Sequence, residues 1–464
     1  MPPYLLAALA MCDDPYLAAR AVRTLARDTE VRRKRLNATS AVFSTAPSVA
    51  APSGAGSAPG GATGPRRTVA DAHHDEKLPG DIVRAEGAPA TDDVAVNEAY
   101  DGLGSTWTLY SEAYHRNSLD DKSLPLLATV HYSKDYDNAY WDGEQMVFGD
   151  GDGKIFGRFT ASVDVIGHEL THGVTDFTAG LRYQGQSGAL NESISDVFGI
   201  LVKQKLLGQD ADQADWLIGA DLLLPGVHGV ALRSMKAPGT AYDDPQLGKD
   251  PQPGHMDDYL RTAADNGGVH TNSGIPNRAF YLAATAIGGP AWEAPGQIWY
   301  SVLSGAPIRA DCDFATFAGL TVDAARNVFG ADSAQQQAVH SAWEQVGVTR
   351  PAAGKKAAGG SSPPAKAAGS ASSTAGSPTV TVRRSGGFAG RTVERTVRLG
   401  ELPEHLAEQW TSLLAGGPRP VSPGRTRPDA FVYQVEAGSL AVTLSEHDLP
   451  ADLRGLLRST LEDG

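Results

Sequence analysis

Two low-complexity stretches divide the 464-residue chain, and they limit what it can fold into more than any other feature. Residues 37–65 carry no charge and hold a single aromatic residue, Phe43. In residues 351–378, 24 of the 28 residues are Ala, Gly, Ser or Pro. Such segments bury too little apolar surface to offset the entropy lost on folding. We therefore expect three folded parts, a head (1–36), a middle (69–350) and a tail (379–464), joined by linkers at 37–68 and 351–378.

Charge and hydropathy exclude several classes of protein. The formal charge is −14, and the acidic excess falls in the middle part, so sequence-independent binding of nucleic acid is not expected. No apolar run approaches the roughly 18 residues of a transmembrane helix, and two cysteines make no disulfide framework. The short apolar run before Met11 has no basic residue ahead of it, unlike a secretory signal. The sequence thus predicts a cytoplasmic protein, with export by a non-standard route left open.

The pattern of the middle part changes along its length. Residues 69–160 are rich in Gly, Asp, aromatic and β-branched residues, which is typical of strands and turns. Residues 161–205 and 270–350 have apolar residues at helical spacing. We predict an α+β fold in which a β-rich half (69–175) precedes a helical half (176–350).

The helical run contains His168-Glu169-Leu170-Thr171-His172. The spacing i, i+4 places both imidazoles on one face of a helix, as two zinc ligands require. Glu169, beside the first of them, can act on a water at the metal. Taken alone, the motif leaves open a helix whose two histidines face solvent.

A catalytic zinc needs a third protein ligand, and Glu192 is a candidate because it lies in a second apolar helix with Asp196 four residues later. One carboxylate can bind the metal while the other orients a ligand histidine. His270 follows Gly267-Gly268. It can donate to a developing oxyanion with Asp265 fixing its tautomer, although a capping or packing role is the plainer alternative.

With these motifs in order, the middle part resembles the thermolysin family of zinc metallopeptidases. The resemblance rests on His168–His172, on Gly188-Ala189-Leu190-Asn191-Glu192-Ser193, on Asn138-Ala139-Tyr140-Trp141-Asp142-Gly143 and on Gly267–His270. It implies a two-lobed α+β fold with a β-rich N-terminal lobe, a helical C-terminal lobe, and the motif helix at the floor of the cleft between them.

The resemblance also implies a role for individual residues. Zinc would be bound by His168, His172 and Glu192, with Glu169 as the general base. His270 and Tyr183 would stabilise the oxyanion, with Asp265 behind His270, and Asn191 and Asp196 would orient the ligand histidines. Residues implied to bind substrate are Asn138, Ala139, Arg233, Val165, Ile218, Leu222 and Leu232. The last four are apolar, so we expect cleavage before Leu, Phe, Ile or Val.

Paired calcium ions, which larger members of the family bind, are doubtful here. Asp164 and Asp215 fit the carboxylate cluster, but Lys203, Leu217 and Ala220 stand where further carboxylates would be. Calcium affinity depends on the number of charged ligands. Lys203 could replace an ion by pairing with Asp164 or Asp215.

The head, with Pro2-Pro3-Tyr4-Leu5 near its start and a helical pattern from Tyr16 to Arg35, resembles the short propeptides of the protealysin subgroup. Such a propeptide folds against the catalytic domain and blocks the cleft, and it would be cut within 37–68. A thiolate of Cys12 could reach the metal as a latency switch, but an incidental thiol is the plainer alternative. Cys312 is expected to be buried.

The tail predicts a compact α+β module. Strands are expected at 380–384, 392–398, 431–435 and 440–444, and helices at 402–414 and 450–461. The patterns Ser385–Gly390, Pro428–Tyr433 and His447–Pro450 resemble emfourin, a small protein inhibitor of protealysin-type enzymes. A peptidase would then carry its own inhibitor.

Two functions follow as hypotheses. The first is a zinc endopeptidase made as a zymogen, acting on proteins or peptides and restrained in cis by its propeptide and its tail. The second is a catalytically silent binding or inhibitor protein whose peptidase body stays blocked. All of the expected catalytic residues are present, which favours the first.

Overall fold

The computed structural model describes residues 1–41, 64–349 apart from 306, and four strands of the tail (379–385, 393–398, 432–437 and 440–445). It divides into two compact units, Met1–Lys356 and Ala357–Gly464. Each unit is described by itself. No helix in the described ranges is long and apolar enough to cross a membrane.

The β-rich lobe is built on a five-stranded sheet with the order β2-β1-β3-β5-β4. Its strands are β1 (Arg67–Asp71), β2 (Asp81–Ala85), β3 (Leu126–Val130), β4 (Ala139–Trp141) and β5 (Met146–Phe148). β1 and β3, and β3 and β5, pair in parallel, whereas β2 and β4 pair antiparallel at the two edges. β4 therefore keeps one side free of the sheet, directly after Asn138.

A long helix in this lobe corrects the expectation of strands and turns throughout 69–160. α3 (Val94–Tyr114) begins at Asp93, whose carboxylate accepts from the N–H groups of Ala95 and Val96, and ends at His115 in a left-handed conformation. Its buried positions have helical spacing, and it packs against β1 and β3. Two glycines and several β-branched and aromatic residues in this helix lower its helix propensity, which explains why composition suggested strands.

The two lobes meet where α4 (Val163–Asp176) packs on α5 (Gly185–Leu207), the pair of helices with the most extensive contact in the unit. Glycines allow this approach. A Cβ on Gly167 would lie 3.0 Å from Val202 Cγ2 and 3.1 Å from Gly199 Cα, and a Cβ on Gly199 would overlap the Asp164 carbonyl oxygen. The zinc motif and the Glu192 helix are thus held face to face.

The remaining helices form the C-terminal lobe, as the sequence predicts. They are α6 (Asp265–Asn272), α7 (Gly274–Ile287), α8 (Ala294–Ser304), α9 (Phe314–Phe329) and α10 (Ala334–Gln345). Between α5 and α6 lie the short strands β6 (Leu217–Ile218), β7 (Arg233–Ser234), β8 (Asp243–Asp244) and β9 (Gly248–Lys249). Short 3₁₀ turns occur at η1 (Phe159–Ala161), η2 (Ala220–Leu222) and η3 (Met256–Asp258). Cys312 is buried, as expected.

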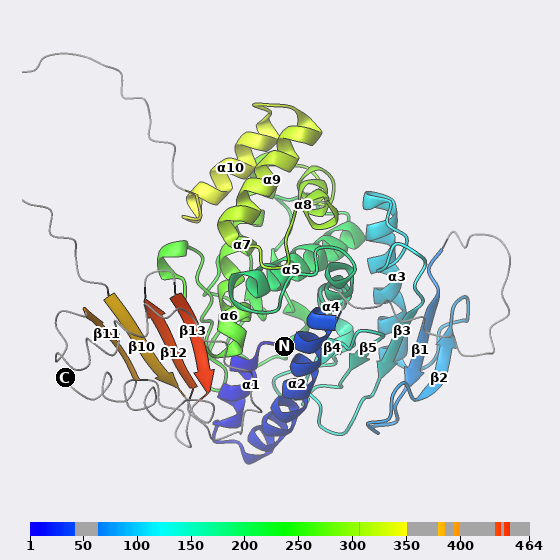
Figure 1. The fold of residues 1–464 in the computed structure, drawn as a ribbon. Coiled ribbons are helices and arrows are strands. Elements are labelled where there is room, and N and C mark those ends of the chain that lie inside the picture. Colours follow the sequence, from blue (N-terminus) through cyan, green and yellow to red (C-terminus); the bar gives the residue numbers. More distant parts are fainter. Residues whose placement is uncertain are drawn as a thin grey trace, which may run out of the picture. The chain divides into compact units, whose positions relative to one another are not determined.

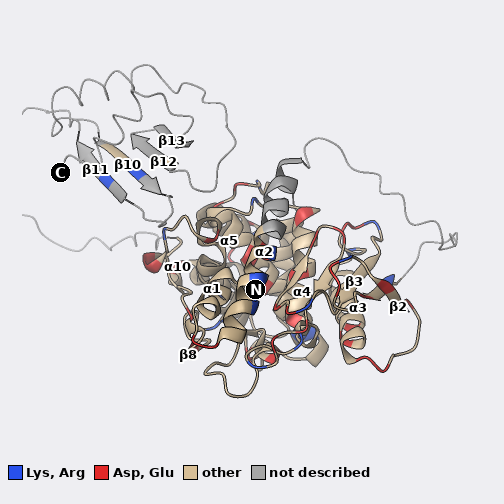
Figure 2. Cartoon of the chain, turned by 90° about the horizontal axis from the view of Figure 1, so that it is seen from below, with Lys and Arg blue, Asp and Glu red and all other residues tan. Residues whose placement is uncertain are grey.

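The head packs onto this body as two helices, α1 (Pro3–Ala10) and α2 (Pro15–Ala41). The helix predicted from Tyr16 is confirmed as α2, and α1 is an addition. Leu5, Leu6 and Leu9 are almost completely buried in the same core cluster as the body. Figures 1 and 2, which differ by a quarter turn, both place the N-terminus of the chain beside α4.

The tail contains an antiparallel sheet with the order β11-β10-β12-β13. Its strands are β10 (Thr379–Ser385), β11 (Val393–Arg398), β12 (Val432–Ala437) and β13 (Leu440–Ser445). The β10–β11 hairpin pairs Val380 with Val397, so the four predicted strands are confirmed. The helices predicted at 402–414 and 450–461 lie outside the described residues.

One histidine joins two parts of the β-rich lobe and predicts a pH dependence. His131 Nδ1 lies 2.8 Å from Asp150 Oδ1, and its Nε2 lies 2.8 Å from Asp93 Oδ2, on the residue that caps α3. The bond to Asp150, opposed by burial and supported by Asp93, raises the pKa of His131 to about 9. Because the folded pKa is raised, the stability from this charge is complete below about pH 6.5 and is lost as the pH rises through about 9.

We expect the free energy of unfolding to fall by about 1 kcal/mol between pH 6 and about pH 9.5 through this group, since His131 is partly exposed and its ion pairs are screened. Urea unfolding of a Glu169→Gln chain, which cannot digest itself, measures this fall. In the same background, His131→Gln should remove that part of the pH dependence. An equally steep decline in the variant would contradict the assignment.

Candidate active site

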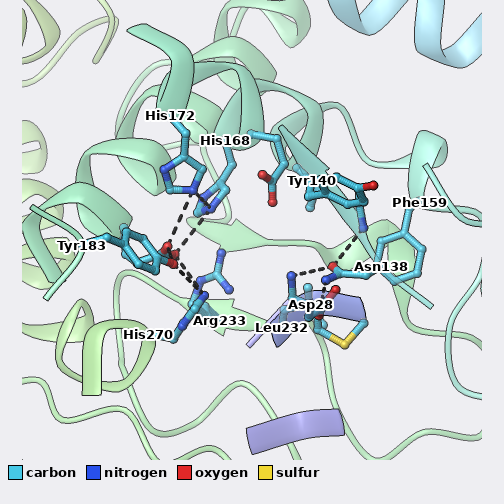
Figure 3. Close-up of a pocket in the computed structure, with 15 residues that line it drawn as sticks. Asp28, Asn138, Tyr140, Phe159, His168, His172, Tyr183, Leu232, Arg233 and His270 are labelled. Atoms are coloured by element: carbon cyan, nitrogen blue, oxygen red, sulfur yellow. Dashed lines mark hydrogen bonds and ion pairs between the residues drawn. The ribbon is translucent and has the colours of Figure 1, made fainter. Parts of the chain in front are cut away.

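The middle of α4 and the N-terminal half of α5 bring the ligand atoms of the predicted metal site together. His168 Nε2 lies 3.2 Å from His172 Nε2, and Glu192 carboxylate oxygens lie 3.5 Å from His168 Nε2 and 3.6 Å from His172 Nε2. Figure 3 shows both imidazoles pointing into one cavity. Atoms bound to one zinc at about 2.0–2.2 Å in a tetrahedron are separated by distances of this size. All three side chains are buried.

The far nitrogens of the two histidines are held by hydrogen bonds. His168 Nδ1 lies 2.8 Å from Asp196 Oδ1, and His172 Nδ1 lies 2.7 Å from Asn191 Oδ1. These bonds assign the proton to Nδ1 and leave each Nε2 lone pair for a metal, which is the usual arrangement of zinc-binding histidines. The donor set therefore fits zinc. Ser195 Oγ, 3.1 Å from His172 Nδ1, is a further contact that the sequence did not reveal.

Asp196 joins the metal site to a second buried charge. Arg233 donates to both of its oxygens, from Nε at 2.8 Å and from Nη2 at 2.6 Å. Asn277 Nδ2 donates a further bond at 2.8 Å. Burial by itself would raise the pKa of Asp196, but Arg233 and His168 outweigh it and lower the pKa to about 2. Arg233, predicted only as a substrate-binding residue, thus also fixes the carboxylate that orients His168.

Asn277 was missed by the sequence analysis. It lies seven residues after His270 on α7 and is buried. In the sequence, Asn277 cannot be told from an ordinary polar residue on the surface of a helix. Only its buried position shows that it belongs to the site. That position depends on how α7 packs on α5, which the sequence does not show.

The other predicted catalytic groups meet across the cavity. Tyr183 Oη lies 3.3 Å from His270 Nε2 and donates to Glu192 Oε1. Asp265 accepts from the His270 backbone N–H at 2.9 Å, and its other oxygen lies 2.8 Å from His270 Nδ1. The turn that allows this runs left-handed from Asp265 to Gly268, with φ of 51°, 50°, 86° and 75°. Its two glycines adopt such angles without strain.

Glu169 lies beside the ligand histidines. Its carboxylate lies within 4.8 Å of the His168 and His172 ligand atoms, and Oε2 accepts from the Trp141 backbone N–H at 3.1 Å. Trp141 ends β4, so the edge strand fixes this carboxylate next to the ligands. The position suits a base that acts on a group bound by both histidines and Glu192.

The cavity has an apolar side that the sequence predicted in part. Val165 and Leu232 line it, together with Phe159 and Tyr140, which were not predicted.

Ile218 and Leu222 are fully buried and are not among the lining residues. Asn138, Ala139 and Arg233 do line the cavity, so five of the seven predicted substrate-binding residues face it directly.

The head occupies the same cavity. Met1 and Asp28 are among its lining residues, and the Met1 amino group donates to Asn138 Oδ1 at 2.6 Å. Asn138 Nδ2 in turn donates to Asp28 Oδ2 at 2.7 Å (Figure 3). Cys12 does not line the cavity; its Sγ lies 3.6 Å from the Asp14 carbonyl oxygen. The structure therefore does not support a Cys12 switch, and the polar groups of Asn138 are already taken by the head.

Comparisons with known protein families agree with this site. Residues 66–176 match the thermolysin metallopeptidase catalytic domain, and residues 179–348 match the thermolysin metallopeptidase alpha-helical domain. Residues 382–461 match emfourin.

Two relatives and one solved structure extend the comparison. An extracellular metalloprotease of Pectobacterium carotovorum subsp. carotovorum is 58% identical over 285 residues, which are 61% of this chain and 81% of the relative. An extracellular minor metalloprotease of Serratia marcescens is 54% identical over 201 residues, 43% of this chain and 57% of the relative. The structure of a precursor of protealysin from Serratia proteamaculans matches with a TM-score of 0.66 and 52% identity, covering 75% of this chain and 99% of that one.

These relatives correct one prediction and confirm another. The expected cytoplasmic location is wrong, because the similar proteins are named extracellular and point to secretion. The lack of a basic segment before Met11 was weak evidence, since it does not exclude other routes of export. The predicted two-lobed α+β fold is confirmed. The chain belongs to the thermolysin family of zinc metallopeptidases.

Proposed function

We propose that this chain is a zinc endopeptidase, made as a zymogen, that cleaves internal peptide bonds before large apolar residues. The observation that carries the proposal is the triad of His168, His172 and Glu192 ligand atoms at 3.2–3.6 Å with the Glu169 carboxylate beside it. Val165, Leu232 and Phe159 make one side of the cavity apolar, which favours a large apolar side chain after the scissile bond.

Each catalytic residue has one task in this proposal. When bound, zinc supplies Lewis-acid chemistry, polarising the scissile carbonyl and making water acidic. Glu169 accepts the proton of the attacking water and passes it to the leaving amine. His270 and Tyr183 donate hydrogen bonds to the oxygen on which negative charge develops. As an imidazolium, His270 donates its Nδ1–H to Asp265 and its Nε2–H to that oxygen.

The substrate backbone is proposed to run beside β4. An edge strand offers unpaired backbone groups to an extended peptide, and β4 is the edge strand next to the metal ligands. Asn138 and Ala139 lie where β4 begins, and Arg233 lies across the cavity. Since Asn138 is bonded to the head, the head must leave before a peptide can use this position.

The base is tested by Glu169→Gln in a chain from which the head has been cut. We expect casein or peptide hydrolysis to fall by about 100–10,000-fold, the usual contribution of a general base, while zinc content stays unchanged. Glu192→Gln is the matched control, because it should release the zinc as well. Hydrolysis that survives Glu169→Gln would contradict the assigned base, and hydrolysis that survives a chelator would contradict zinc.

The calcium pair of larger relatives is proposed to be replaced by Lys203. Its Nζ lies 2.9 Å from Asp215 Oδ2, 3.9 Å from Asp164 Oδ2 and 3.4 Å from the Leu217 carbonyl oxygen. Burial lowers the pKa of Lys203, but Asp164 and Asp215 outweigh it and raise the pKa above its usual value. An ammonium thus lies where a cation would otherwise neutralise the fully buried Asp164.

We expect added calcium to leave the thermal midpoint of the wild-type chain unchanged at a fixed zinc concentration. Lys203→Met should lower the free energy of unfolding by about 3–5 kcal/mol, because it leaves the buried charge of Asp164 without a cation, with only hydrogen bonds from Ser162 and Gly219. Lys205→Met is the control, since its more exposed pair with Glu112 should contribute at most about 1 kcal/mol. A calcium-dependent rise in the wild-type midpoint would refute the replacement.

The tail is proposed to inhibit the peptidase of its own chain, in keeping with its emfourin match. A coil of 28 residues spans about 30 Å, and such a tether gives an effective concentration of about 1 mM. The alternative, a permanently silent peptidase body, has less support because every catalytic group has partners suited to its role. The two readings differ in what happens when the tail is removed.

Deleting residues 351–464 should raise the activity of the processed enzyme. For an inhibitor whose Kd is below about 0.1 mM, a 1 mM effective concentration fills more than about 90% of the clefts, so the rise is at least about 10-fold. A chain with a protease site inserted in 351–378 serves as the control, because cutting the tether and diluting should give the same rise. Activity that stays unchanged after deletion of the tail and after cutting of the tether would refute inhibition in cis.

A further inference from the structure

The head places one arginine in a pocket of the catalytic domain. Arg20 on α2 donates from Nε to Asp137 Oδ2 at 3.0 Å and from Nη2 to Asp137 Oδ1 at 2.5 Å. The same Nη2 reaches the Gly151 carbonyl oxygen at 2.8 Å, and Nη1 donates to Asp135. This is a bidentate ion pair between a planar guanidinium and a carboxylate. Such pairs are among the stronger hydrogen-bonded contacts in proteins, and they also fix the relative orientation of the two groups.

With the head in place, the pocket is buried and polar. Only 6% of the Arg20 side chain and 3% of the Asp137 side chain are exposed. Burial raises the pKa of Asp137 and Arg20 opposes this shift, while the neighbouring charge of Asp152 adds to it. Asp152 itself is buried, and its Oδ2 has no hydrogen-bond partner. The Asp137 site therefore has more negative charge around it than one arginine neutralises.

Every cation paired with Asp135 and Asp137 in the described part of the chain comes from the head. Arg20 pairs with both, and Arg23 Nη2 lies 2.8 Å from Asp135 Oδ2. The acceptors, by contrast, belong to the loop before β4 and to the turn after β5. When the head is lost, these acceptors stay with the enzyme. Loss of the head removes the cation of these carboxylates and uncovers them, so a guanidinium from another peptide can take the place of Arg20.

We propose that Asp137, Asp135 and the Gly151 carbonyl form an arginine subsite of the processed enzyme, which Arg20 fills in the zymogen. The inference rests on the proposed peptidase function and adds a second determinant to the apolar pocket. The position supports it, because Asp137 directly precedes Asn138, which lines the cavity, and its own N–H donates to Thr24 of the head. A substrate held at Asn138 passes next to Asp137.

The subsite discriminates between cations. Two donors of one guanidinium meet both oxygens of Asp137 while a third reaches Gly151, a fork that a lysine ammonium cannot reproduce. Citrulline has nearly the same shape as arginine but carries no charge. Arginine should therefore be preferred to lysine, and lysine to citrulline.

Fluorogenic peptides with leucine after the scissile bond test this. Arginine, lysine or citrulline is placed in turn at each successive position after the leucine, and kcat and KM are measured with the processed full chain. At one position we expect kcat/KM for arginine to exceed that for citrulline by about 10–100-fold, mainly through KM, as for one buried charge-assisted pair. Asp137→Asn should bring this ratio close to one.

Glu144→Gln is the matched control. It removes one carboxylate from the exposed β4–β5 turn, so it should leave the ratio as in the wild type if the effect is local. Asp135→Asn is a second subsite variant, in case Asp137→Asn fails to fold, and should lower the ratio in part. Equal hydrolysis of arginine and citrulline peptides at every position would overturn the subsite while leaving the peptidase intact.

A binding measurement separates the subsite from catalysis. In a processed Glu169→Gln chain, the Kd of the arginine peptide should be about 10–100-fold lower than that of the citrulline peptide, and Asp137→Asn should abolish the difference. Equal Kd values would overturn the subsite. If this difference is found and no peptide is hydrolysed by the parent enzyme, the proposed function fails and the guanidinium site stands.

Discussion

The close approach of α4 and α5 is the constraint on which the rest of the structure depends. Gly167 and Gly199 let the two backbones meet where a Cβ on either would crowd the other helix. Only at that separation can Glu192 on α5 reach the two histidines of α4, while Asn191 and Asp196 reach their far nitrogens. The ligands are thus positioned by rigid helices and not by loops, which is how metal sites are held to within a fraction of an ångström.

The sequence could predict those site residues whose partners lie close to them along the chain, on the same helix. His168, Glu169 and His172 are revealed by their spacing, because one helix sets their geometry. Asn277 and Ser195 were missed, because each acts on a partner from another element and nothing near it in sequence marks it. Ile218 and Leu222 were predicted at the substrate by resemblance; both are buried and do not line the cavity while the head is in place.

The fold shows the same division. The helices of the C-terminal lobe and the strands of the tail follow from apolar spacing, because their patterns are long or strictly alternating. α3 was not expected, since its glycines and aromatic residues suit contact with the sheet and hide the helical period. Packing against the sheet makes this segment a helix. Intrinsic helix propensity is only a weak guide where such packing is extensive.

The head binds through polar contacts to residues just before β4, one of which, Asn138, lines the cavity. Asp28 bonds to Asn138 and to Tyr136, and Arg20 bonds to Asp137, so three successive positions before β4 are held by side chains of α2. Apolar burial of Leu5, Leu6 and Leu9 supplies non-directional affinity, whereas these bonds fix where the head lies. A propeptide bound in this way shows which donors and acceptors the residues beneath it offer, because its own side chains are bonded to them. The acceptors that Arg20 uses are therefore the groups from which we propose an arginine subsite beyond the apolar side of the cavity.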